Sequence, residues 1–460
     1  MTGSDRRLRR LVVSSFVVAV GLSVTARGVA AHAGSLSGAL EPAPVPLWLV
    51  VVTGGGVVGV SFLFTTLMTD HDTIRSLNAA RLRLPTPAGS ALASVGRLLG
   101  LAVLLVVLSL AFFGPPDPLG NLAVLVVWVG WWAGYTMFTY LAVDVWDVLN
   151  PWRTLAGLVP LDARSLPDRV GAWPSVVGLL LLVWVEVVTP VAENPRILGS
   201  IVLAYSVVTV LGGAAYGDAW FERVDPVARV FRLYGLLAPI QRTDDGLSLS
   251  VPGTAVARDP DIVSGDDAAF VLALLWVTSY DGLVSTATWN ELVAPIVALG
   301  VPALLLYLLV VFVGFGAVVG AYRLAARLAR RTAPTYVSAD YVARWFAPSL
   351  LPIAAGYHLA HFLGYFLGLA PSLVVVAADP LSPPATVPTL AVPGWFGTLQ
   401  LTFVVVGHIL AVWIAHGRAF ELFTGRLQPI RSQYPFVVVM VAYTVSSLWI
   451  VTQPFASPLT

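Results

Sequence analysis

Arginine residues alternate along this chain between one loop and the next, and this alternation constrains the fold more than any other feature. The chain contains no lysine, so all 26 basic residues are arginine. Beyond the N-terminal segment they fall almost entirely in every second loop between apolar segments, and the intervening loops hold only Arg196. Cytoplasmic loops of membrane proteins are enriched in Lys and Arg. The pattern therefore predicts a polytopic membrane protein and the side on which each loop lies.

The composition agrees with a membrane protein and excludes several other classes. Hydrophobic residues make up 57% of the chain and charged residues 11%, whereas soluble domains carry about 25% charged residues. A net charge of +1 argues against a nucleic-acid partner, which favours a strongly basic face. The absence of cysteine excludes disulfides and thiolate metal sites. The expected partners are the lipid bilayer and a small-molecule substrate.

Residues 1–31 are predicted to be a secretory signal peptide. An apolar stretch at 11–24 is too short for a comfortable span, and small residues precede a cleavage position after Ala31. The basic residues before the apolar stretch are Arg6, Arg7, Arg9 and Arg10. An uncleaved first helix is the alternative. Cleavage would make His32 the first residue of the mature chain, where its amine and ring could chelate copper.

Ten further segments are long and apolar enough to cross a bilayer, which takes about 20 residues each. Their predicted ranges are 46–69, 97–113, 120–143, 173–192, 197–216, 267–283, 298–322, 350–376, 396–417 and 434–454. Ten crossings that begin outside place the C-terminus outside and every arginine-rich loop inside. We therefore expect an all-α transmembrane bundle, a multi-pass protein of the plasma membrane whose mature N-terminus and C-terminus are both external.

The span-containing region 32–460 is predicted to be a single transmembrane domain with one insertion at 217–266. The first part of the insertion, 217–240, is amphipathic, which predicts a helix along the membrane surface. The second part, 241–266, is rich in aspartate and is predicted to be a mobile loop. No separate soluble domain is expected.

A short pattern occurs twice, at 144–153 and at 218–229. Each copy has an aspartate at a helix end, then Asn150 or Asp225 followed by proline, and then an arginine. An internal repeat is one interpretation. The other is local, because Asn or Asp followed by Pro is a common start of a helix.

Ionisable side chains inside the predicted spans are candidates for function, because such groups cost free energy in a bilayer unless they are paired or wet. The chain has few of them at membrane depth or at the ends of spans, and they are Asp144, Asp147, Glu186, Asp281, His358, His361, His408 and His416. His71, between two aspartates at a cytoplasmic helix end, is expected to be solvated.

A metal site is the most specific hypothesis for these residues. His358 and His361 are three residues apart, which places them on one helix face, and His408 lies near the middle of the next span. With Asp281 they are the ligand types of a divalent metal ion of unknown identity that could activate water. Asp281 would act as a ligand or general base, and Tyr357 would orient the leaving oxygen.

Three interpretations of these residues stay open. The first is a metal-dependent hydrolase of phosphoester-like or other small ester substrates. The second is a transporter or permease that handles metal ions or protons, since neutral histidine can relay protons. The third is a structural membrane subunit, in which the same side chains only bond one helix to another.

Several strings along the chain resemble a family of polytopic membrane proteins described as fenitrothion hydrolase-like. The strings keep their order over nearly the whole chain and are Ala31-His32, 147–153, 216–219, Tyr280-Asp281-Gly282, 351–361, Gly407-His408, Ala415-His416 and 433–435. The resemblance implies a helical membrane bundle and the hydrolysis of an organophosphate ester with release of a phenol. It implies no catalytic role for any particular residue.

Overall fold

The protein is described from a computed structural model that covers residues 47–85, 89–159, 164–243, 246–258, 267–454 and 456–459. The predicted signal peptide and His32 lie outside these residues.

Within the described residues, nine helical segments are long and apolar enough to cross a membrane. They are α4 (Gly89–Phe113), the continuous α5 (Leu122–Leu125), η2 (Val126–Tyr135) and α6 (Thr136–Leu141), η3 (Asp168–Val170) with α9 (Trp173–Val188), α10 (Pro195–Tyr216), α14 (Asp267–Val284), α16 (Ala303–Thr332), α17 (Ala339–Phe346) with η4 (Ala347–Leu350) and α18 (Leu351–Ala378), α19 (Phe396–Leu422) and α20 (Gln428–Val451). These segments match nine of the ten predicted spans in order. The predicted all-α polytopic fold is confirmed, and the chain has the architecture of an integral membrane protein.

The first predicted span, 46–69, falls on α2 (Leu47–Thr66). The segment Val52–Thr66 and α3 (His71–Ala79) meet the length and apolarity criterion only as a pair, and they are bent by 113° to each other. The bend has a local cause, because Asp70 is the N-cap of α3 and accepts a hydrogen bond from the Thr73 amide. This pair is a broken span or a re-entrant segment.

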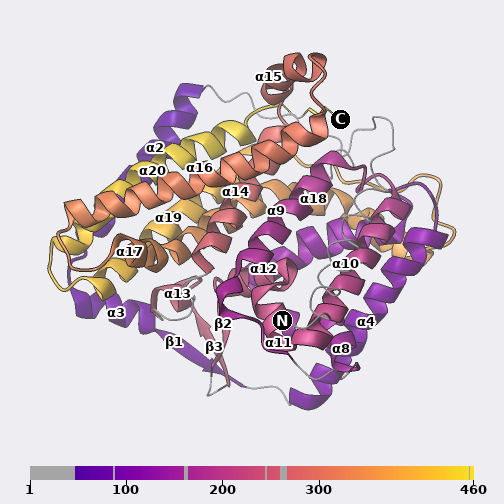
Figure 1. Cartoon of the computed structure of the whole chain (residues 1–460), viewed down its shortest axis with the longest axis horizontal. Helices are drawn as coiled ribbons and strands as arrows, with labels where there is room; N and C mark the ends of the chain where they lie inside the picture. Colours follow the sequence, from indigo (N-terminus) through magenta and orange to yellow (C-terminus); the bar gives the residue numbers. More distant parts are fainter. Residues whose placement is uncertain are drawn as a thin grey trace.

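Short helices connect or cover the spans. They are α7 (Trp146–Leu149), α8 (Pro151–Gly157), α11 (Asp218–Arg223), α12 (Pro226–Gly235), α13 (Thr254–Arg258) and α15 (Ala287–Ala298). The helices α2, α16, α19 and α20 gather on one side of the bundle, and α4, α8 and α10 on the other (Figure 1). Between them, α14 and α18 pack on each other, α14 also packs on α9, and α18 also packs on η2 and α19.

The expected surface helix at 217–240 is corrected by the structure. Eight of the ten residues of α12 are buried, and the helix packs against α6, α9 and α18. The helix can be buried although it carries two arginines, because both side chains have partners. The side chain of Arg229 forms an ion pair with Asp267 at the start of α14, Arg232 bonds the same carboxylate at 2.6 Å, and Arg229 also donates to the Glu222 carbonyl at 2.7 Å. The amphipathic pattern thus reflects a buried ion pair rather than a membrane surface.

The twice-occurring Asx-Pro pattern marks two helix starts. The Asn150 side chain accepts a hydrogen bond from the Arg153 amide at 3.0 Å and begins α8. The Asp225 carboxylate accepts from the amides of Val227 and Ala228 and begins α12. These contacts confirm the local interpretation of the pattern as an N-cap followed by proline.

Three short strands form a small sheet that was not predicted from the sequence. They are β1 (Arg81–Leu84), β2 (Ile240–Thr243) and β3 (Gly246–Ser250), in the order β1-β3-β2 with both pairings antiparallel. The strands β2 and β3 and the helix α13 occupy part of the segment predicted as a mobile loop, so that prediction is wrong for 241–243, 246–250 and 254–258. Residues 259–266 lie outside the described chain.

Candidate functional site

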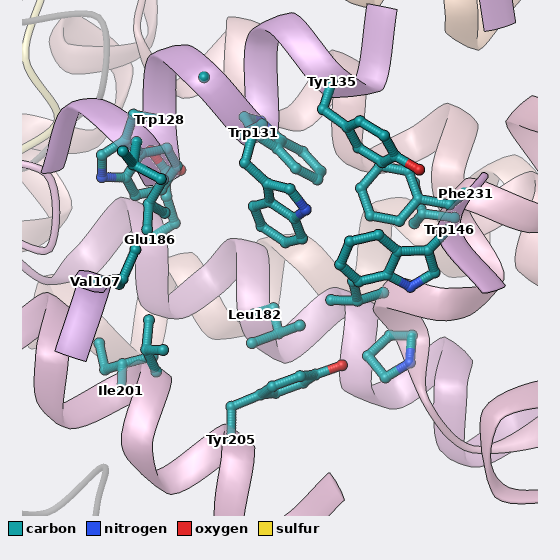
Figure 2. Close-up of a pocket in the computed structure, with 18 of the residues that line it drawn as sticks. Val107, Trp128, Trp131, Tyr135, Trp146, Leu182, Glu186, Ile201, Tyr205 and Phe231 are labelled. Carbon is teal, nitrogen blue, oxygen red and sulfur yellow. The ribbon is translucent and has the colours of Figure 1, made fainter. Parts of the chain in front are cut away.

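A cavity of about 490 Å³ lies between the helices α4, η2, α9, α10, α12, α14 and α18. Its wall is almost entirely apolar and is rich in aromatic rings (Figure 2). The aromatic lining residues are Trp128, Trp131, Trp132, Tyr135, Trp146, Trp152, Tyr205, Phe231, Tyr234 and Phe362. Its volume is in the range of small-molecule sites. A cavity of this kind suits a largely apolar molecule.

The π-helix η2 supplies four of these rings. Trp128, Trp131, Trp132 and Tyr135 all come from Val126–Tyr135, and π-helical turns within α-helical spans occur frequently at functional sites. The Trp131 ring lies 5.5 Å from that of Phe231 and 5.8 Å from that of Trp146. Figure 2 shows Phe231 and Trp146 at one end of the cavity, Trp128 and Glu186 at the other, and Trp131 between them.

Three ionisable residues line this apolar cavity. They are Glu186 of α9, Asp281 of α14 and His358 of α18. Each was predicted as an ionisable residue at membrane depth, and the structure brings them from three separate spans to one cavity. Glu186 had no predicted partner in the sequence, and only the packing of α9 against α14 places it in the wall of the same cavity as the other two.

Asp281 connects the cavity to His361. The Nε2 atom of His361 lies 3.6 Å from Oδ2 of Asp281. The side chain of His361 is 29% exposed and that of Asp281 is 16% exposed, so the pair is only partly enclosed. Tyr357 packs beside it, with its ring stacked on that of His361 at 6.5 Å between centroids. The Tyr357 hydroxyl lies over Gly282 and leaves no room for a Cβ atom there.

His358 and His361 are held in different surroundings although they share one helix face. The Nδ1 atom of His358 and the hydroxyl of Tyr140 are 3.1 Å apart. Its Nε2 atom is buried without a hydrogen-bond partner among the described residues. The ring of Phe362 packs against both imidazoles, at 4.6 Å from His358 and 4.8 Å from His361. His358 therefore belongs to the cavity wall and His361 to the ion pair with Asp281.

His408 is bonded within its own span. Its Nδ1 atom lies 2.8 Å from the Val404 carbonyl, and its ring packs beside Tyr443 of α20. It does not line the cavity. Spans six, eight and nine do adjoin, because α18 packs on both α14 and α19, but this packing does not bring His408 into the cavity wall.

The described residues offer no ready ligand set for a metal ion. Among them, no three His, Cys, Asp or Glu side chains are grouped so that they could hold one. The metal site predicted for His358, His361 and His408 therefore stays a prediction.

Two other histidines bond the ends of helices together. His71 was expected to be solvated, but its Nδ1 atom lies 3.0 Å from the Phe420 carbonyl and its ring packs on Phe420. In His416, Nε2 lies 2.9 Å from the Met68 carbonyl and Nδ1 lies 3.2 Å from the Gln433 amide nitrogen. Both side chains join α19 to the region around the bend between α2 and α3.

The aromatic wall was missed by sequence reasoning. A signal for it exists, since Trp128, Trp131, Trp132 and Tyr135 recur at intervals of three and four residues, which is the spacing of one helix face. Tryptophans are also common as anchors at the ends of spans, so their presence alone does not indicate a cavity. The depth of a tryptophan in its span is the feature that distinguishes the two cases.

The buried carboxyl of Asp225, at the start of α12, forms a hydrogen bond with a residue of the cavity wall. Tyr205, which lines the cavity, donates a hydrogen bond from its hydroxyl to Asp225. Burial raises the pKa of Asp225 to about 6, although the bonds from Tyr205 and two backbone amides and the charge of Arg153 favour its ionised form. Burial likewise raises the pKa of Asp144, which follows α6, to about 6.

We expect the raised pKa of Asp225 to make the folded protein more stable at pH 5 than at pH 7.5. A carboxyl whose folded pKa exceeds its unfolded value stabilises the fold below the unfolded pKa, and loses that contribution as the pH rises through about 6. For Asp225 alone the loss between these two pH values is about 1–1.5 kcal/mol. Thermal unfolding of wild type and Asp225→Asn across this range measures it. An identical pH slope in both proteins would contradict the assignment.

Comparisons with protein-family models, with curated proteins and with solved structures found no match for this chain. Its function must therefore be inferred from the geometry of the cavity and from the chemistry of the residues that line it.

Proposed function

We propose that this integral membrane protein binds an apolar, lipid-soluble small molecule in the cavity and converts it by acid–base chemistry at Asp281. Ester hydrolysis is the reaction that the resemblance to fenitrothion hydrolase-like proteins suggests. The observation that carries the proposal is the position of Asp281 and His358 in the wall of an otherwise apolar, aromatic cavity.

The wall of the cavity supports an apolar ligand. Aromatic rings offer a large apolar contact area and favour edge-to-face contacts with other rings. The rings of Trp131, Trp146 and Phe231 already pack on one another at centroid distances of 4.6–5.8 Å. An aromatic or acyl group can add to this cluster, and a molecule dissolved in the bilayer brings such a group without the need for an aqueous path.

The ionisable residues support a reaction at one side of that ligand. Carboxylates and histidines at membrane depth are costly, and they mark proton relays or substrate sites. Asp281 faces the cavity and is paired with the more exposed His361. A proton accepted by Asp281 can therefore pass to His361, since histidine is the side chain best suited to exchange protons near physiological pH.

Hydrolysis at this site consumes one water molecule. The water oxygen forms a bond to the carbonyl carbon or phosphorus of the ester, while Asp281 accepts one proton from that water. The bond from carbon or phosphorus to the leaving oxygen breaks, and the proton is returned to that oxygen to give an alcohol or phenol. General acid–base catalysis of this kind contributes typically about 100-fold to 10,000-fold in rate.

The proposal is tested with two chromogenic esters, 4-nitrophenyl octanoate and diethyl 4-nitrophenyl phosphate, and with octyl 4-nitrophenyl ether as an analogue that cannot be hydrolysed. Binding of the ether is followed by quenching of tryptophan fluorescence, and turnover of the esters by release of 4-nitrophenolate. Asp281→Asn is expected to bind the ether as wild type does and to lose about 100-fold or more of the hydrolysis rate. Undiminished hydrolysis in Asp281→Asn would overturn the acid–base role.

A second pair of variants tests the cavity. Leu182→Trp places an indole in the cavity that Leu182 lines (Figure 2), and it is expected to abolish binding of the ether. The control is Leu309→Trp on α16, where the native side chain is 59% exposed and faces away from the bundle. Unchanged binding by Leu182→Trp would contradict the cavity as the binding site. Binding of the ether by wild type without hydrolysis of either ester would contradict the hydrolytic reaction and favour transport.

The metal-dependent form of the proposal has a separate readout. Elemental analysis of purified wild type, His361→Ala and His408→Ala measures bound metal directly. Metal that is retained by wild type and lost in both variants would support the predicted ligand set. Metal that is retained by His408→Ala would remove that residue from the set.

A further inference from the structure

The small sheet has one apolar and one polar face, and the register shows which residues share each face. Leu82 of β1 lies opposite Leu249 of β3, and Leu249 lies opposite Ile240 of β2. Leu84 likewise lies opposite Leu247. Because side chains alternate between the faces of a strand, these five apolar residues lie on one face, together with Arg242. The other face carries Arg81, Arg83, Gln241, Ser248 and Ser250.

The polar face is the one that packs on the protein along β2 and β3, whereas Arg81 and Arg83 on the edge strand β1 are exposed. Ser248 is 2% exposed, and the Gln241 side-chain amide donates to the carbonyls of Gly235 and Ala238 at the end of α12. The apolar face points away, with Leu82 63% exposed and Leu249 40% exposed. A sheet that is half exposed to water normally has the reverse arrangement, with its apolar face on the core.

The sheet lies at the end of two membrane spans. The Ile240 amide donates to the Ala142 carbonyl at 3.1 Å, and Ala142 directly follows the span that ends at Leu141. On the other edge, β1 ends at Leu84, and the span of α4 begins at Ala91. The apolar face is therefore held close to the level at which the bilayer ends.

Among the described residues of the sheet, the charge on this face is positive. Arg242 shares the face with the leucines and is exposed, and Arg81 and Arg83, on the opposite face of the edge strand β1, are exposed as well. This part of the chain belongs to the arginine-rich loops that the sequence pattern predicts to be cytoplasmic. The cytoplasmic leaflet is anionic, and each Lys or Arg near it contributes about 1 kcal/mol of attraction.

We propose that the apolar face of the sheet lies in the headgroup region of the cytoplasmic leaflet, with Leu82 and Leu249 in contact with lipid and Arg242 bound to anionic headgroups. The sheet would then anchor the two halves of the bundle that it connects, since β1 follows α3 and β2 follows α12. This contact is independent of the cavity and of any reaction there.

The chain has no cysteine, so a single introduced cysteine can be spin-labelled without further change. Leu82→Cys and Arg81→Cys are neighbours on β1 whose side chains lie on opposite faces, and Arg81→Cys is the matched control. In nanodiscs, the label at 82 is expected to collide readily with oxygen and poorly with a water-soluble nickel chelate, and the label at 81 to show the opposite preference. Equal access of the nickel chelate to both labels would overturn the proposal.

Two further measurements complete the test. Spin–spin coupling between labels at 82 would show a second copy of the chain on this face and would overturn the lipid contact. Replacing part of the phosphatidylcholine by phosphatidylglycerol is expected to increase the depth of the label at 82 in the membrane. The substitution Arg242→Gln is expected to remove this increase. A depth that is the same in both lipids would overturn the role assigned to Arg242.

Discussion

Replacing Asp267 by asparagine is expected to reduce the free energy of unfolding by about 3–5 kcal/mol, because it leaves a buried cation without its counter-ion. The side chains of Asp267 and Arg229 are 1% and 2% exposed, and the same carboxylate also bonds Arg232. Unfolding in mixed micelles titrated with sodium dodecyl sulfate measures the difference. The loss is expected to appear as one cooperative shift, since this carboxylate joins α12 to α14.

A matched control for this prediction exists on the surface. Arg75 and Glu421 form an ion pair at 2.8 Å, and their side chains are 55% and 29% exposed. Exposed pairs contribute about 0–1 kcal/mol, so Glu421→Gln is expected to have little effect. Equal losses for Asp267→Asn and Glu421→Gln would contradict a special role for burial.

Alanine at Gly407 is expected to destabilise the protein, although alanine usually stabilises a helix by about 1 kcal/mol relative to glycine. A Cβ atom at Gly407 would lie 2.5 Å from the Pro352 carbonyl oxygen and 3.2 Å from the Cα atom of Gly356. Because backbone atoms of α18 cannot give way as a flexible side chain does, α18 and α19 must separate. Overpacking of this kind costs about 1–3 kcal/mol and occasionally more.

The same substitution at Gly316 is the control. Gly316 is also in the middle of a span, in α16, but a Cβ atom there meets nothing within 4 Å. Gly316→Ala is expected to be neutral or to stabilise by up to about 1 kcal/mol. A thermal-unfolding comparison of the two variants gives the difference, and equal behaviour would contradict the close approach of α18 and α19.

The positions of the spans and of several helix starts could be predicted from sequence because both are local properties. An apolar run of about 20 residues is sufficient to form a span, and nine of the ten predicted runs are helices of that kind in the described chain. Asn150 and Asp225 begin α8 and α12 because each side-chain oxygen accepts a hydrogen bond from an amide two or three residues later. Neither property depends on what packs against the helix.

The candidate site could be predicted only in part. The free-energy cost of ionisable side chains in a bilayer identified Asp281, His358, His361 and Glu186 as candidates. The structure places three of these four in the wall of one cavity and pairs the fourth, His361, with Asp281. The same argument grouped His408 with them, whereas His408 bonds the carbonyl of Val404 in its own helix. The free-energy cost of a buried imidazole can be met by any nearby polar group, so cost alone does not identify the partner.

Sequence alone was sufficient to predict a polytopic helical membrane protein, nine of the ten segments that are long and apolar enough to cross, and where several helices begin, since each of these follows from apolar length and from hydrogen bonds between near neighbours. Only the folded arrangement shows which spans adjoin, that β1 pairs with β3 from Arg81↔Ser250 to Leu84↔Leu247, and that an aromatic cavity meets Asp281. In a bilayer the lipid-facing and protein-facing sides of a span are both apolar, so hydropathy along the chain does not specify which helix lies beside which.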